Sequence, residues 1–234
     1  DEVLLPEEFR EAGIIETARA DGNFDILLGA IEDAGLTTTL QFLGDFTVFA
    51  PSDAAFEALG LETVQGLTDE QLTDVLTYHV LSGAIPSSAL QPTQTVEALN
   101  EEDVFITLDS DVVTVNGSST VERADLEVRN GVIHAVDQVL LPDAFGTVVD
   151  NAIKRFDLAT LVDLVVDQNL AGTLAEADSS YTVFAPTNAA FAAISSTLET
   201  LNDQQVTNTL LYHVLNSQVL SGDLGASQQV MTLN

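Results

Sequence analysis

The chain contains no cysteine and only three histidines. A disulfide-built fold is therefore excluded, and a structural zinc site is not expected because it needs four thiolate or imidazole ligands. No apolar run approaches the roughly 18 residues that cross a bilayer. The opening Asp1–Pro6 lacks the basic start and cleavage site of a signal peptide. Since 46% of the 234 residues are hydrophobic, the fold must rest on apolar cores, with enough material for two.

Basic residues are also scarce, with six against 37 acidic ones and Lys154 the only lysine, which gives a formal charge of −31. Repulsion between so many negative charges opposes compaction in dilute buffer. In about 1 M salt the Debye length falls to roughly 3 Å, and most of this repulsion is screened. We therefore predict a halophilic microbial source. The alternative is an acidic extracellular protein that its charge keeps soluble. A phosphate backbone would be repelled, so nucleic acid is excluded as a partner.

Catalytic motifs are missing as well. The sequence has no Gly-rich phosphate loop, no Gly-x-Ser-x-Gly elbow and no cysteine nucleophile. Carboxylates are so numerous that any pair could be proposed as catalytic, which makes such a pair uninformative. We predict a protein that is not an enzyme and that needs no cofactor and no metal.

The most informative feature present is a repetition. Residues 47–56 read Thr-Val-Phe-Ala-Pro-Ser-Asp-Ala-Ala-Phe, and residues 182–191 differ from them only by Thr for Ser and Asn for Asp. The first motif thus returns after 135 residues, and Tyr78-His79-Val80-Leu81 returns after 134 as Tyr212-His213-Val214-Leu215. A period of this length is the size of a domain. The sequence predicts a tandem duplication of one folded module.

A further match sets the module boundaries, because Asp137–Pro142 resembles the opening Asp1–Pro6. We predict the tail of a preceding repeat and a linker at 1–12, a first module at 13–142, and a second at 147–234. Counterparts of 101–142 do not follow in the second copy, so it would lack its C-terminal strands. We therefore expect that the chain is an excerpt of a longer array. The second module would be completed by residues beyond Asn234 or by strands of a neighbouring chain, or it would stay incomplete.

These motifs resemble the signature of the fasciclin (FAS1) domain. So does the run that precedes Asp137–Pro142, which reads Asn130-Gly131-Val132-Ile133-His134-Ala135-Val136. The resemblance covers nearly the whole chain. It implies an α+β fold in which each module is a wedge of β-strands with helices packed alongside. It also implies an extracellular or surface-anchored protein that serves adhesion or matrix association.

Periodicity places the motifs on elements. An amphipathic stripe of Phe24, Leu27, Leu28 and Ile31 predicts a helix, as does its counterpart of Leu158, Leu161, Val162 and Val165. Apolar runs at 46–50 and 181–185 predict strands, and Ser52 and Thr187 then predict N-caps for helices 53–59 and 188–194. Capping boxes begin further helices after Thr68 and Asn202. Alternation predicts strands at 104–108, 112–115, 126–128 and 132–141, with hairpin turns at Asn116-Gly117 and Asn130-Gly131.

The candidate contact residues are Tyr78, His79, Tyr212 and His213, on the last turn of two predicted helices. The negative end of a helix can hold such a histidine protonated, or the imidazole can face a partner. In animal members of the resembled family the Tyr-His pair has been linked to receptor binding. The alternative is a structural role, with Tyr and His hydrogen-bonded across the junction of helix and sheet. His134, on an apolar strand face, is expected to be a satisfied core residue.

Asn116-Gly117-Ser118 is the one sequon and makes Asn116 a candidate glycosylation site. The hairpin turn alone also explains this Asn-Gly pair.

The residues and the resemblance together predict a FAS1-repeat adhesion or matrix-association protein, extracellular or at the cell surface, that binds a cell-surface protein or polysaccharide. One alternative is a structural subunit of a surface layer or filament that assembles homotypically by strand exchange. The other is a binding module for a small ligand or glycan.

Overall fold

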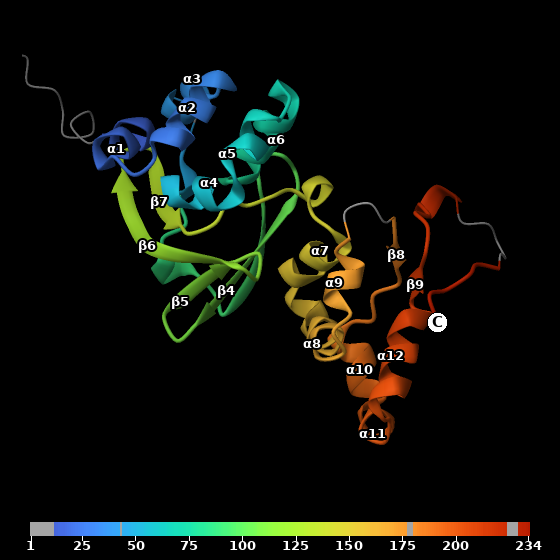
Figure 1. Ribbon diagram of the computed structural model, residues 1–234. Helices are drawn as coiled ribbons and strands as arrows, with labels where there is room; N and C mark the ends of the chain where they lie inside the picture. Colours follow the sequence, from blue (N-terminus) through green and yellow to red (C-terminus); the bar gives the residue numbers. More distant parts are fainter. Residues whose placement is uncertain (1–11, 43, 177–179, 224–228) are drawn as a thin grey trace, which may run out of the picture. The chain divides into compact units, whose positions relative to one another are not determined.

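The structure, a computed structural model, describes residues 12–42, 44–176, 180–223 and 229–234. It divides into two compact units, Asp1–Ala144 and Phe145–Asn234. The predicted tail of a preceding repeat, residues 1–12, lies outside the described residues except for Ala12. Each unit is described by itself below, and Figure 1 labels the elements.

The helices of the first unit begin at recognisable caps. Ser52 accepts a hydrogen bond from the Ala55 amide and begins α4 at the predicted residue. Thr68 and Gln71 form the predicted capping box of α6. The predicted apolar stripe is buried on α2 and on the residue before it. The helices of this unit are α1 (Ile14–Asp21), α2 (Asp25–Asp33), α3 (Thr37–Phe42), α4 (Asp53–Leu59), α5 (Leu61–Gln65) and α6 (Asp69–Tyr78), with short 3-10 turns η2 (Ser87–Ala89) and η3 (Asp143–Phe145).

Seven strands of the first unit form one sheet in the order β2-β1-β7-β6-β5-β4-β3. Only β1 and β7 run parallel, with Val48 opposite Ile133. The other neighbours are antiparallel. The strands are β1 (Phe46–Pro51), β2 (Val80–Ser82), β3 (Thr93–Glu97), β4 (Asp103–Asp109), β5 (Val112–Val115), β6 (Ser119–Val128) and β7 (Gly131–Val136).

Two apolar clusters stabilise this unit. In the first, the buried faces of the helices pack against β1 and β7, including Ile133 and Ala135. In the second, Phe49 and Tyr78 pack with β4 and β5 and with Leu140. Figure 1 shows the helices gathered along one side of a strongly bent sheet. The predicted α+β fold, a wedge of strands with helices alongside, is confirmed.

The second unit repeats the helical part of this order. Its helices are α7 (Val148–Lys154), α8 (Ala159–Asp167), α9 (Ala171–Leu174), α10 (Asn188–Ala193), α11 (Ser195–Leu198) and α12 (Asp203–Tyr212), with 3-10 turns η4 (Phe156–Leu158) and η5 (Ser221–Asp223). Asn202 and Gln205 form the predicted capping box of α12. Its sheet contains β8 (Thr182–Val183) and β9 (Val214–Leu215). Among the described residues of this unit, an apolar cluster lies between α7, α8, α10 and α12.

Three sequence predictions need correction. β8 covers two residues instead of 181–185, because within the described residues it pairs only with β9, whereas β1 has a strand on either side. β7 ends at Val136 instead of 141. At Asn130-Gly131 only the glycine has positive φ, and a Cβ there would lie 1.9 Å from the Phe46 carbonyl oxygen. Close approach of β1, more than the turn, therefore requires Gly131.

Within the part of the chain that the structure describes, no helix combines the length and apolarity that crossing a membrane demands.

Candidate functional site

Tyr78 is fully buried where the end of α6 meets β4. Its hydroxyl donates to the Asp103 carbonyl oxygen at 3.0 Å and accepts from Asn116 Nδ2 at 3.0 Å. Burial raises the pKa of this phenol. The side chain thus holds a helix, a strand and a turn together, and it presents no atom to a partner.

His79 caps the C-terminus of α6 and is 1% exposed. The Leu140 amide donates to His79 Nε2 at 2.8 Å, so the neutral ring carries its proton on Nδ1, which donates to the Val75 carbonyl oxygen at 2.7 Å. Burial lowers the pKa of His79 to about 4. The ring is therefore neutral, contrary to the hypothesis that the helix end holds this histidine protonated, because the Leu140 amide needs an acceptor at Nε2 and because desolvation lowers the pKa more than the hydrogen bond to the Val75 carbonyl oxygen raises it.

Asn116 occupies the turn after β5 in a left-handed conformation, with φ of 53°, which asparagine tolerates. Its side chain is buried, and Oδ1 accepts from the Phe105 amide at 3.0 Å while Nδ2 donates to Tyr78. A glycan on this nitrogen would have to displace the amide from the core. The hairpin role alone accounts for Asn116 in the folded unit.

His134 is the satisfied core residue that its strand position predicts. Nε2 lies 2.9 Å from the Ile85 carbonyl oxygen, the Asp125 amide donates to Nδ1 at 3.3 Å, and the ring packs on Phe49.

Tyr212 and His213 occupy the same positions on α12 in a different environment. Tyr212 is 65% exposed, and its ring meets His213 edge-on at 6.5 Å between centroids. His213 Nδ1 lies 2.8 Å from the Thr209 carbonyl oxygen, repeating the helical contact of His79. Phe184, the counterpart of buried Phe49, is 49% exposed. Tyr and Phe are therefore buried in the first unit and exposed in the second, whereas Val214 and Leu215 are buried like Val80 and Leu81.

Several hydrogen bonds to the backbone around these residues nevertheless recur in both units. Asp53 Oδ1 accepts from the Ile26 amide at 2.9 Å, and Asn188 Oδ1 accepts from the Thr160 amide at 2.9 Å. Each amide lies at the start of the helix that carries the apolar stripe. Other bonds recur as well. The amides of Phe49 and Phe184 donate to the carbonyl oxygens of His79 and His213, and the amides of Leu99 and Leu233 donate to those of Val80 and Val214. The hydroxyls of Thr47 and Thr182 each donate to a carbonyl oxygen and accept from an amide.

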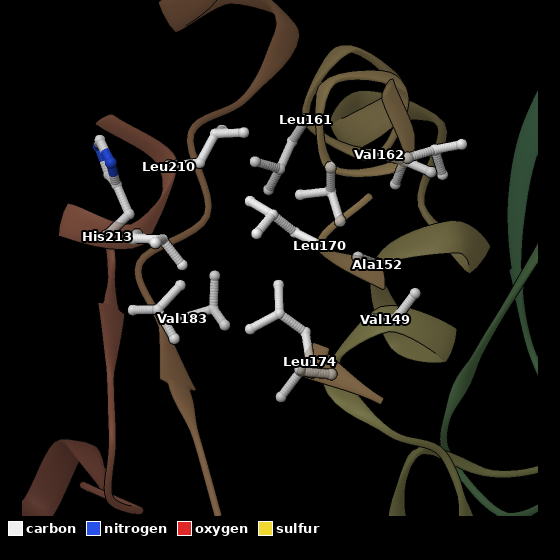
Figure 2. A pocket seen from close by; sticks show the side chains of 14 residues that line it. Val149, Ala152, Leu161, Val162, Leu170, Leu174, Val183, Leu210 and His213 are labelled. Carbon is white, nitrogen blue, oxygen red and sulfur yellow. The ribbon is translucent and has the colours of Figure 1, made fainter. Parts of the chain in front are cut away.

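An apolar pocket of about 40 Å³ lies in the second unit, beside His213. Figure 2 shows Val183 and Leu210 on one side of it and Val149 and Val162 on the other, with His213 at its edge. The remaining lining residues are Val148, Ala152, Leu161, Val165, Val166, Leu170, Leu174, Leu211 and Val214. Sequence reasoning missed this pocket. The signal that could have found it is the match of its lining to the helical core of the first unit.

The described residues hold no cluster of three or more His, Asp or Glu placed to bind a metal ion. Asp21 is engaged by Arg123, whose two nitrogens donate to its carboxylate at 2.8 and 3.0 Å and lower the pKa of Asp21. The polar groups of the two units thus serve helix starts, turns and strand junctions.

The model of the fasciclin domain matches residues 22–142 and again residues 156–234. The chain belongs to the fasciclin domain family. Both matched segments contain the Tyr-His pair and the ten-residue motif that leads into α4 or α10, so this chain displays these residues twice.

Similar proteins come from animals and bacteria. The chain is 31% identical over 215 residues to transforming growth factor-beta-induced protein ig-h3 of Sus scrofa, covering 91% of this chain and 31% of that protein. It is 34% identical over 114 residues to cell surface glycolipoprotein MPB83 of Mycobacterium bovis, covering 48% of this chain and 50% of that protein. The chain therefore spans a third to a half of these relatives.

A solved FAS1 domain pair from the insect cell adhesion molecule fasciclin I has the same fold. Its TM-score is 0.69 at 17% identity, and the match covers 92% of this chain and 82% of that structure.

Proposed function

We propose that this chain is part of an extracellular or cell-surface protein of tandem FAS1 units that acts in adhesion or matrix association, by binding and not by catalysis. The observation that carries the proposal is the match of the fasciclin domain model to two segments of this chain, residues 22–142 and 156–234. The solved structure with the same fold is likewise a pair of FAS1 domains, and it comes from a cell adhesion molecule.

The relatives support the cellular setting of this proposal. MPB83 is by its name a cell-surface glycolipoprotein, and the structural neighbour is a cell adhesion molecule. We infer from the charge of −31 that the protein works in concentrated salt, where apolar contacts carry the binding and surface repulsion is screened. Its partner would be a cell-surface protein or polysaccharide, or another copy of the chain.

Microspheres coated with the chain test the proposal. In 2 M KCl we expect them to cluster with one another or to be retained on one of three coated surfaces, which carry the relative ig-h3, an acidic polysaccharide or a neutral polysaccharide. Microspheres coated with albumin serve as the control. If the coated microspheres remain dispersed and wash off all three surfaces at every salt concentration, the adhesion role is refuted.

A further inference from the structure

A cavity of about 320 Å³ lies in the first unit, between the starts of α2 and α4 and the middle of β6. All of its lining residues belong to this unit, and none of them belongs to the Tyr-His motif. Pockets that bind small molecules have volumes of roughly 300–1,000 Å³. The cavity therefore has room for one small ligand or for one small group of a larger ligand.

The strand β6 is irregular where it borders the cavity. Val121 lies opposite Val136 and Arg123 lies opposite Ala135, so Glu122 is an extra residue in a β-bulge. In a regular strand, neighbouring side chains point to opposite faces of the sheet. Here the consecutive residues Glu122 and Arg123 both line the cavity. The bulge thus brings a carboxylate and a guanidinium together in its wall.

Arg123 is held in place and still has donors to offer. Its two terminal nitrogens donate to the Asp21 carboxylate at 2.8 and 3.0 Å, and the guanidinium lies 5.7 Å from the centre of the Phe24 ring. A guanidinium carries five N–H donors, and the bonds to Asp21 use only two of them. The remaining donors are available to a ligand, while the ion pair with Asp21 compensates the positive charge.

The lining also supplies hydrogen-bond acceptors. Asp53 Oδ1 accepts from the Ile26 amide at 2.9 Å, whereas Oδ2 has no hydrogen-bond partner among the described residues. The exposed Glu122 carboxylate adds further acceptors. The Ser52 hydroxyl accepts from the Ala55 amide at 3.3 Å and can donate its own proton. A ligand in this cavity therefore meets donors and acceptors side by side.

We propose that the cavity binds a neutral sugar residue of a polysaccharide. Each sugar hydroxyl both donates and accepts, which matches the mixed lining. An anionic group would be repelled by Asp53 and Glu122, and an ammonium group would bring no acceptor for the donors of Arg123. Ala54 and Ala135 supply apolar surface for the C–H groups of the sugar ring. This site deepens the proposed function, on which it rests, by naming the part of a polysaccharide partner that is recognised.

The test is an NMR titration of the full chain in 2 M KCl with the methyl glycosides of glucose, galactose, mannose and N-acetylglucosamine. We expect at least one of them to shift the amide resonances of Asn23, Asp53 and Glu122 with saturation. Ala54→Leu places a larger side chain in the cavity and should weaken binding at least tenfold. Ala58→Leu makes the same change at another exposed position of α4, outside the lining, and should leave binding unchanged.

Asp53→Asn tests the polar contact with a residue that the fold accepts. The second unit has Asn188 at the equivalent position, and its Oδ1 accepts from the Thr160 amide at 2.9 Å. Asp53→Asn should therefore keep the bond to the Ile26 amide and leave Tm nearly unchanged. It replaces the acceptor Oδ2 by a donor, so glycoside binding should weaken at least fivefold.

Three results would overturn the proposal. They are the absence of saturable shifts with all four glycosides, equal binding by the Ala54→Leu chain, and saturation of the same amides by butylammonium or propionate in place of the glycosides. The last result would assign the cavity to a charged group of a partner. Retention of coated microspheres on neutral polysaccharide is measured separately. Retention or clustering without glycoside binding refutes only the cavity site, and glycoside binding without either of them refutes only the adhesion role.

Discussion

His79 makes the first unit sensitive to acid in a way that the structure quantifies. Burial lowers the pKa of His79 to about 4, from an ordinary value of 6.5. Between these two pH values the unfolded chain binds a proton on His79 that the folded chain does not. The stability that the neutral ring contributes is therefore fully present above pH 6.5 and is lost as the pH falls toward 4. The difference corresponds to about 3 kcal/mol of unfolding free energy.

The assay is urea unfolding between pH 7.5 and 4 in 2 M KCl, with pulsed hydrogen exchange to follow peptides of the first unit separately from those of the second. His79→Gln provides the comparison. This variant should be less stable than the wild type at pH 7.5, because the Leu140 amide loses its acceptor. On acidification, however, its unfolding free energy should fall by about 3 kcal/mol less than that of the wild type. Carboxylates also titrate in this range, and both proteins share them, so the difference between the two profiles isolates His79.

A direct measurement accompanies the unfolding curves. The imidazole resonance of His79 in NMR spectra should show the neutral form, protonated on Nδ1, at pH 5.5. Parallel stability profiles for the wild type and His79→Gln, or a charged His79 at pH 5.5 in the folded protein, would refute the reasoning from burial and from the Leu140 hydrogen bond.

The remaining predictions concern salt and two turns. If the charge of −31 reflects adaptation to salt, Tm should rise by many degrees between 0.1 and 2 M KCl, and a flat Tm would contradict that origin. Asn116→Ala should lower the unfolding free energy of the first unit by roughly 1–3 kcal/mol, because the Phe105 amide loses its buried acceptor; urea unfolding equal to wild type would show that the turn does not need this side chain. Gly131→Ala should cost clearly more than Gly83→Ala in the same assay. Both positions have positive φ, but only a Cβ at 131 would meet the Phe46 backbone, so equal losses would rule out close approach as the reason for the glycine.

The elements set by local residues were predictable from the sequence. α4 starts and ends as predicted because Ser52 caps its first turn and Gly60 follows its last. β3 was not predicted, because its residues are mostly polar and half exposed and its strand character comes from pairing with β4. β7 stops at Val136, where the Asp137 amide still donates to the Thr120 carbonyl oxygen at 3.1 Å but the Thr120 amide is accepted by the Asp137 side chain, at 2.6 Å, and not by the Asp137 backbone. Pairing partners far away in sequence decide such ends.

The different fates of the two Tyr-His pairs could not be predicted from the motif, since its residues are identical in both copies. Burial of Tyr78 depends on Asp103 and Asn116, and the state of His79 depends on Leu140. These partners lie 25 to 61 residues further along the chain. A candidate site defined by a motif therefore has to be assessed separately in each copy.

The central proposal is that the chain acts by binding through exposed residues, Tyr212 among them, while the buried Tyr78 and His79 are structural. It is tested by clustering of microspheres coated with Tyr212→Ser or with Tyr78→Phe in 2 M KCl. Tyr212→Ser removes an exposed ring, so it should reduce clustering and change stability by less than about 0.5 kcal/mol. Tyr78→Phe removes the bonds to Asp103 and Asn116, so it should lower stability by roughly 1–3 kcal/mol and leave clustering unchanged. Unchanged clustering with Tyr212→Ser, or lost clustering in a fully stable Tyr78→Phe, would contradict the account.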